Sequence, residues 1–291
     1  MTQTIIFQID GGLGKNIMAT AVLSAIKKAY RKANIIVVTA YPDVFIANPN
    51  VNKVLNPQQT NGIYAKNIMN KEAKAFIADP YHHSDFITES KHLLEIWCDM
   101  YGVKYDGELP ELFISKSEKQ YFAPFYKLDK PILAIHPNGG AIGQPLKYSW
   151  TRDIPQPIIQ EVINKFKTEY AVVHIKREDQ LLYENTIGAL DNFRSIAILL
   201  SMSAKRLLID SSAMHIATAL NLPSVVTWVG TSPKVFGYDI HTNIMAKTPP
   251  KEPNLNHNSY TKFMLFQDIS TIPYNDLNEV FDVNEIINAL V

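Results

Sequence analysis

The sequence has almost no cysteine. Cys98 is the single cysteine among 291 residues, which excludes an internal disulfide and is typical of a protein from a reducing compartment. It ends a stretch with helical spacing, residues 93–98, so we expect it to be buried and structural rather than reactive.

An excess of one charge and a long apolar run are also missing. Lys and Arg together number 28, as do Asp and Glu, so no global basic field favours bulk binding to nucleic acid or membranes. No apolar run approaches the roughly 20 residues that span a bilayer. Residues 1–4 lead directly into a strand pattern without a signal peptide. We therefore expect a cytoplasmic protein without a transmembrane segment; peripheral membrane contact stays open.

Short apolar runs alternate with helical patterns along the chain. The predicted strands are residues 4–9, 35–39, 51–55, 75–78, 132–135, 170–175, 206–209 and 222–228, and the main predicted helices are 17–32, 155–166, 195–202 and 283–290. Strands that alternate with helices pair in parallel. Because the pattern begins afresh after residues 126–131, we predict two α/β, Rossmann-like domains facing a cleft, residues 1–128 and 129–291. The last helix is expected to pack back on the body, the N-terminal domain included.

Residues 206–220 are the stretch around which the chain is organised. An apolar strand leads into Asp210, Ser211 and Ser212, whose side chains suit a helix start because they accept hydrogen bonds from its first N–H groups. The same N–H groups and the helix dipole favour a negatively charged ligand. The stretch therefore predicts either an ordinary capped helix or an anion site.

A glycine-rich turn follows the first strand. Its Gly14-Lys15 pair resembles the end of a Walker A loop, but that loop requires a glycine at Ile9 and a hydroxyl at Asn16. A dinucleotide fingerprint would require its third glycine at Ile17. Both are excluded, and what remains is a turn whose backbone can approach another molecule closely at a helix start.

Several motifs, taken in order, resemble family 9 of the glycosyltransferases, the heptosyltransferase group. The resemblance spans about residues 4–240. Its most specific part is Asp210-Ser211-Ser212-Ala213-Met214-His215, and it also includes residues 11–22, 48–54, 135–139, Lys147, Trp150 and 230–233.

The resemblance implies a GT-B architecture, with a nucleotide-sugar donor held mainly by the second domain and the acceptor mainly by the first. It implies inverting displacement at the anomeric carbon without a metal or other cofactor, and the sequence has no Asp-x-Asp triad for a divalent ion. Helix N-termini and cationic side chains would then meet the charge of the leaving diphosphate. The residues expected at the diphosphate are Gly12, Asn138, Lys147, Ser211, Ser212, Ala213, Met214 and His215, and those expected at the nucleoside are Lys176 and Glu178.

Lys15 is the main departure from the family. The family usually places an acidic residue there, which is proposed to deprotonate the acceptor hydroxyl, whereas a lysine is normally protonated near neutral pH. We expect Asp10, at the end of the first strand, to take the proton beside Lys15, because an ammonium stabilises and orients a neighbouring carboxylate. Asp79, His82 and His83 are expected to bind the acceptor and are the alternative bases.

Three functions are compatible with the sequence. The first is sugar transfer from a nucleotide-diphosphate sugar to a glycan or lipid-linked sugar. The second is transfer to a hydroxylated DNA base, which requires Lys27, Lys28, Arg31 and Lys32 to line the cleft. The third is a nucleotide-sugar-binding module that has lost catalysis, and it is motivated by Lys15.

Overall fold

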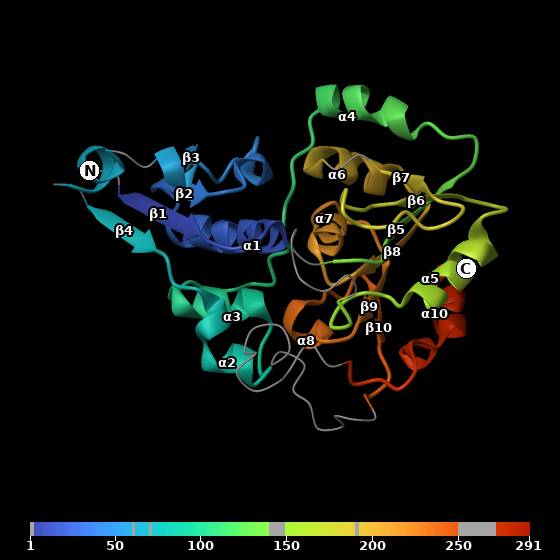
Figure 1. The fold of residues 1–291 in the computed structure, drawn as a ribbon. Coiled ribbons are helices and arrows are strands. Elements are labelled where there is room, and N and C mark those ends of the chain that lie inside the picture. Colours follow the sequence, from blue (N-terminus) through green and yellow to red (C-terminus); the bar gives the residue numbers. More distant parts are fainter. Residues whose placement is uncertain (1–2, 60–61, 70–71, 140–148, 190–191, 250–271) are drawn as a thin grey trace. The chain divides into compact units, whose positions relative to one another are not determined.

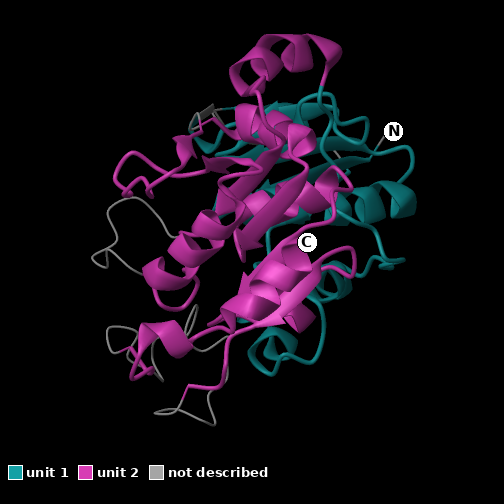
Figure 2. Cartoon of the chain, turned by 90° about the vertical axis from the view of Figure 1, so that its right-hand side faces the viewer, with its two compact units in different colours: residues 1–114 teal, residues 115–291 magenta. Residues whose placement is uncertain are grey.

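The computed structural model describes residues 3–59, 62–69, 72–139, 149–189, 192–249 and 272–291 (Figure 1). Residue contacts divide the chain into two compact units, Met1–Ile114 and Ser115–Val291 (Figure 2). Each unit has its own parallel sheet covered by helices. This is the α/β fold that the alternating patterns predict.

The first unit is built on a four-stranded sheet of order β3-β2-β1-β4, in which every neighbouring pair is parallel. The strands are β1 (Thr4–Ile9), β2 (Asn34–Thr39), β3 (Lys53–Leu55) and β4 (Ala73–Phe76). The helices are α1 (Leu13–Ala29), α2 (Ser84–Ile87) and α3 (Leu93–Met100), with single helical turns η1 (Pro42–Phe45), η2 (Pro57–Gln59), η3 (Tyr64–Ile68) and η4 (Pro80–His82).

Helix α1 begins earlier than the sequence predicts. It starts at Leu13 rather than Ile17, with Gly12 at the N-cap position. The amide of the fully buried Asn16 donates to the Gly12 carbonyl at 3.0 Å and so closes the first turn around a polar side chain. Burial of the helix, rather than helix propensity, decides its start, because tertiary packing supplies most helical stability in proteins.

The edge strand β4 lies two residues before the predicted one. Its register is fixed by β1, with Thr4 opposite Ala73. The apolar run suggested residues 75–78, yet Ile77 is 61% exposed, whereas Phe76 is buried and stacks on Tyr101 at a centroid distance of 4.5 Å. The first and last residues of β4 are therefore set by its pairing with β1 rather than by the hydrophobicity of its sequence.

The second unit is built on a six-stranded parallel sheet of order β10-β9-β8-β5-β6-β7. The strands are β5 (Ile132–His136), β6 (Ala171–His174), β7 (Ile187–Gly188), β8 (Lys205–Ile209), β9 (Val225–Trp228) and β10 (Thr242–Met245). The helices are α4 (Lys116–Phe122), α5 (Gln156–Phe166), α6 (Phe193–Met202), α7 (Ser212–Ala219), α8 (Pro233–Phe236) and α10 (Val283–Leu290), with turns η5 (Ala123–Tyr126) and η6 (Leu277–Glu279).

Helices cover both faces of this sheet. On one face, α5 and α10 pack together over a core that includes Leu207, Ile209 and Trp150. On the other, α6 and α7 pack against each other and against β5 and β8 (Figure 1). The last helix, α10, thus packs back on α5 of its own unit. The edge strands β7 and β10 escaped the sequence analysis because both are short and largely exposed at their ends.

Residues 115–126 pack with the second compact unit, which begins at Ser115; the domain boundary near residue 128 stays a prediction. In α4, the Glu118 carboxylate accepts a hydrogen bond from Arg194 Nε of α6 at 2.6 Å. In η5, the hydroxyl of Tyr126 is 2.6 Å from that of Ser195, also in α6. These contacts fix a segment in which only Tyr126 is buried, and its sequence carries no signal of them.

The Glu118–Arg194 pair yields a stability prediction. The hydrogen bond from Arg194 lowers the pKa of Glu118 from 4.5 to about 2. Glu118→Gln should therefore lower the free energy of unfolding in urea at pH 7 by about 2 kcal/mol, because it leaves a buried guanidinium without its charged partner. The unfolded carboxyl takes up a proton before the folded one as the pH falls, so this loss should disappear between about pH 5 and pH 2.

Lys119→Gln, on an exposed position of the same helix, is the matched control and should change the unfolding free energy by less than about 0.5 kcal/mol. A Glu118→Gln loss that stays constant down to pH 2 would contradict the ion pair as its cause.

Candidate functional site

The second unit has a topological switch point between β5 and β8. From β5 the chain proceeds to β6 on one side, and it later returns to place β8 on the other. In open parallel sheets, ligands bind beyond the carboxyl ends of the strands at such a point. His136 ends β5, and Asp210 and Ser211 follow β8, so these residues mark the expected crevice.

A hydrogen bond between His136 and Ser211 bridges this switch point. The imidazole Nδ1 of His136 is 2.8 Å from the hydroxyl of Ser211. Ser211 occupies the N-cap of α7, but its side chain makes no cap hydrogen bond, contrary to the capping role predicted for it. Asp210 is buried, and its carboxylate accepts a hydrogen bond from the Thr231 hydroxyl at 2.8 Å.

The first backbone N–H groups of α7 are therefore left without a capping side chain at the N-cap residue. They belong to Ser212, Ala213 and Met214, of which Ser212 is partly exposed and the other two are buried. Helix-starting N–H groups have no partner within the helix and carry the positive end of its dipole. The arrangement suits a bound anion.

His136 is electrically neutral near pH 7. Its enclosure by protein, with a smaller contribution from the charge of Arg177, lowers the pKa of the imidazole to about 4. A neutral ring can exchange a hydrogen bond with the Ser211 hydroxyl without adding a positive charge. Any anion at α7 is thus met by backbone dipoles rather than by an imidazolium.

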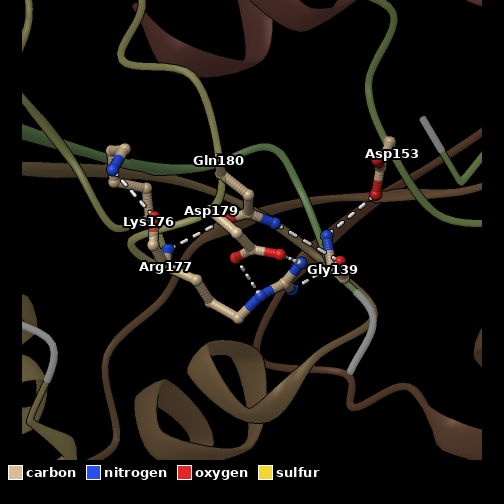
Figure 3. A network of polar contacts seen from close by, with 6 residues as sticks. All are labelled: Gly139, Asp153, Lys176, Arg177, Asp179 and Gln180. Carbon is tan, nitrogen blue, oxygen red and sulfur yellow. Dashed lines mark hydrogen bonds and ion pairs between the residues drawn. The ribbon is translucent and has the colours of Figure 1, made fainter. Parts of the chain in front are cut away.

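A buried carboxylate fixes the turn that follows β5 (Figure 3). Asp153 accepts hydrogen bonds from the backbone N–H of Gly139 at 2.8 Å and of Ser149 at 3.0 Å. The Gly139 carbonyl in turn accepts from the guanidinium of Arg177 at 2.9 Å and the amide of Gln180 at 3.4 Å. Burial raises the pKa of Asp153, while these donors and the Arg177 charge act against that rise.

The turn after β9 packs tightly on the same loop. The backbone N–H of Gly230 donates to the Thr151 carbonyl at 2.7 Å. A Cβ at Gly230 would lie 2.9 Å from that oxygen, a distance that real Cβ atoms do not adopt. A glycine is therefore required where the loops after β5 and β9 meet.

Most residues predicted to bind the donor lie at this edge, but several are already engaged. Asn138 donates to Asp153 at 3.3 Å and accepts from the Tyr183 hydroxyl at 3.0 Å. The buried His215 pairs with the Tyr238 hydroxyl at 3.0 Å. Lys147 lies outside the described residues.

The two residues predicted at the nucleoside follow β6. Lys176 donates to the carbonyl of Arg177 at 2.7 Å, and Glu178 is exposed (Figure 3 shows Lys176). Sequence reasoning passed over His136 and Asp153. His136 could have been noticed as the polar end of a buried strand, whereas nothing near Asp153 in the sequence announces its burial.

A second switch point lies in the first unit, between β1 and β4, which flank each other although β2 follows β1 in the chain. Here the Lys15 ammonium pairs with Asp79 Oδ2 at 2.8 Å. The expected pairing of Lys15 with Asp10 is wrong: the exposed Asp10 accepts hydrogen bonds from the Gln8 amide at 3.3 and 3.4 Å.

The other residues predicted in this unit surround the same loops. Gly12 is exposed at the start of α1, and His82 is exposed in η4. His83 caps α2, where its Nδ1 accepts a hydrogen bond from the Asp85 N–H at 3.2 Å. Gly12 is predicted at the donor diphosphate, whereas His82 and His83 are predicted at the acceptor, and both roles stay predictions.

Solved structures share this fold. The chain superposes on a glycosyl transferase family 9 protein from Veillonella parvula with a TM-score of 0.69 and 15% identity, over 98% of this chain and 95% of that one. For the E. coli ADP-heptose LPS heptosyltransferase II the TM-score is 0.59 with 16% identity, over 84% and 90%. For the E. coli heptosyltransferase WaaC with ADP it is 0.54 with 11% identity, over 90% and 97%.

The fold is that of the GT-B glycosyltransferases. The resemblance to family 9 that the motifs suggested is thus confirmed at the level of the fold. A scan against protein-family models and a search of curated protein sequences both find no match. Within the described ranges, the chain has no helix long and apolar enough to cross a membrane.

His174, at the end of β6, is a buried histidine whose protonation opposes folding of this unit. It is fully buried, stacks on Tyr183 at a centroid distance of 4.9 Å, and neither ring nitrogen has a hydrogen-bond partner within the part of the chain that the structure describes. Burial, together with the charges of His136 and Lys176, lowers its pKa from 6.5 to about 3.

His174→Phe should flatten the pH dependence of stability. The unfolded chain protonates this histidine near pH 6.5 and the folded chain only near 3, so the free energy of unfolding falls as the pH drops through that window. Phenylalanine keeps the stacking and removes the titration. Urea unfolding at pH 7 and pH 5 should show a smaller drop for His174→Phe than for the wild type, with stability at pH 7 kept or increased. His82→Gln, at an exposed histidine, should retain the wild-type drop; an equal drop in His174→Phe would refute the assignment.

Proposed function

We propose that the chain is a glycosyltransferase that moves a sugar from a nucleotide-diphosphate sugar to a hydroxyl acceptor, with inversion and without a metal ion. The second unit binds the donor and the first binds the acceptor. The observation that carries the proposal is the His136–Ser211 hydrogen bond, which turns the N-cap side chain of α7 away from the helix start.

The α7 N-terminus supports binding of the donor diphosphate. When the bond between the anomeric carbon and the diphosphate breaks, negative charge develops on the leaving oxygen. N–H groups held in place before the reaction stabilise such charge without reorganisation. Here the N–H groups of Ser212, Ala213 and Met214 perform that role, and the neutral His136 keeps Ser211 oriented.

Metal independence stays part of the proposal. Among the residues that the structure describes, no three His, Cys, Asp or Glu side chains come together as ligands for a metal ion. The helix dipole and backbone N–H groups are the alternative means of meeting the diphosphate charge. The nucleoside is proposed to lie over the residues that follow β6, Lys176 and Glu178.

The position of the basic residues favours a glycan or lipid-linked sugar over DNA as the acceptor. Lys27 and Lys28 lie in the last turn of α1, which runs back from the carboxyl edge of the sheet. Lys27 donates to the carbonyl of Ala33, just before β2, and Lys28 pairs with Glu108 at 2.5 Å. These lysines therefore lie at the amino edge of the sheet, away from Asp79 and the glycine turn.

Nucleoside diphosphates test the donor site directly. ADP, GDP, UDP and CDP should be added in turn to the protein in EDTA, and the melting temperature recorded. A ligand that binds only the folded state stabilises it, by about 2.7 kcal/mol at a hundredfold excess over Kd. We expect at least one of the four to raise the melting temperature. Ser212→Asp, which places a negative charge at the start of α7, should weaken its binding tenfold or more.

Ser117→Asp makes the same substitution in the exposed first turn of α4 and should leave binding unchanged. The proposal fails if EDTA abolishes the stabilisation, or if Ser212→Asp binds the nucleotide as tightly as the wild type does.

A further inference from the structure

Lys15 is a buried cation at the carboxyl edge of the first sheet. Its ammonium lies 5.1 Å from the centroid of the Tyr81 ring and 5.4 Å from that of Trp97, and it pairs with Asp79. Aromatic faces attract a cation, but they do not replace the water that it gives up. An apolar side chain of similar size would fill this space at lower cost, so stability alone is a weak reason for a lysine here.

Asp79 is fixed in orientation yet reachable from solvent. One carboxylate oxygen receives the Lys15 ammonium at 2.8 Å, and the other accepts the backbone N–H of Tyr81 at 3.0 Å. The Tyr101 hydroxyl donates to the carbonyl of the preceding residue, Ala78, at 2.9 Å. The side chain of Asp79 nevertheless stays 34% exposed.

The glycine turn leaves room over this pair. Gly11 adopts a φ of +99°, which side-chain-bearing residues rarely adopt, and a Cβ there would lie 3.1 Å from Lys15 Cδ. Gly11 and Gly12 are both exposed and follow β1, which pairs with β4, and Asp79 lies in the loop after β4. Backbone without side chains thus borders Lys15, the partner of the Asp79 carboxylate, at the edge where parallel sheets bind ligands.

The other proton acceptors in this unit are less suitable. Asp10 is exposed, and within the described residues its carboxylate accepts from the neutral Gln8 amide rather than from a cation. His83 uses Nδ1 as an acceptor at the start of α2, which leaves its proton on Nε2, so that nitrogen can only donate. His82 is exposed in η4.

We propose that Asp79 is the group that accepts the proton of the acceptor hydroxyl, and that Lys15 is the residue that positions it. This inference rests on the proposed function. As the hydroxyl oxygen forms its bond to the anomeric carbon, its proton passes to the Asp79 carboxylate. The bond from the anomeric carbon to the diphosphate breaks, and its electron pair leaves with the diphosphate. The lysine that replaces an acid on α1 is thus compensated by a carboxylate on the neighbouring loop.

Hydrolysis of ADP-, GDP-, UDP- and CDP-sugars, with water as the acceptor, tests this role through release of the nucleoside diphosphate. Asp79→Asn should lower kcat about a hundredfold or more, the usual range for loss of a general base, while the KM for the donor changes less than twofold. Asp99→Asn is the matched control, because Asp99 also pairs with a lysine, Lys91 at 2.7 Å, but on an exposed face of α3. It should keep the wild-type kcat.

Lys15 is tested by the pH profile of kcat. Lys15→Met removes the ammonium that favours the charged carboxylate, so the acid limb of the profile should move to higher pH. Lys15→Arg restores a cation and should return the limb toward its wild-type position. If the Lys15–Asp79 pair only joins α1 to the β4–α2 loop, Lys15→Met should lower the melting temperature without shifting the pH profile of kcat.

The possible outcomes distinguish a failure of the proposed function from a failure of the role proposed for Asp79. If the wild type hydrolyses none of the sugars, the proposed function itself is wrong. If it hydrolyses one of them and Asp79→Asn does so at the same rate, or if Asp10→Asn alone is inactive, only the role of Asp79 is overturned.

Discussion

Parallel pairing of every strand is the constraint on which the rest of the structure depends. It requires a crossover after each strand and helices over both faces, and it brings all carboxyl ends in a sheet to one edge. Because strand order reverses direction beside β1 and again beside β5, each sheet has a switch point, where ligands bind in such folds. Lys15 with Asp79 lies at the first, and His136 with Ser211 lies at the second.

Polar side chains buried at these edges give the loops defined positions. Asn16 closes the first turn of α1 and accepts a hydrogen bond from Thr39 at the end of β2. Asp153 fixes the turn after β5 by accepting hydrogen bonds from the backbone N–H groups of Gly139 and Ser149. Such groups are costly to bury unless their hydrogen bonds are formed, so each one favours a single loop conformation. Binding residues placed by rigid loops need little reorganisation when a ligand arrives.

The sequence predicts the strands that are buried on both sides, because continuous apolar runs identify them. It predicts edge strands poorly: β4 is displaced, and β7 and β10 have no apolar run to identify them. The order of the motifs identified the start of a helix at Ser212, but it did not reveal that the Ser211 hydroxyl pairs with His136. The Lys15–Asp79 pair could not be foreseen either, since parallel pairing of β1 with β4 joins residues 64 positions apart.

Amide hydrogen exchange with bound nucleotide tests the central claim most directly, because helix-starting N–H groups without a helical partner exchange readily until a ligand accepts from them. Exchange should be followed with saturating ADP, GDP, UDP or CDP, whichever stabilises the protein most. The account predicts that the amides of residues 212–214 slow markedly, while those of residues 11–15 keep their rates. Unchanged exchange at residues 212–214, with protection at the glycine turn instead, would contradict it.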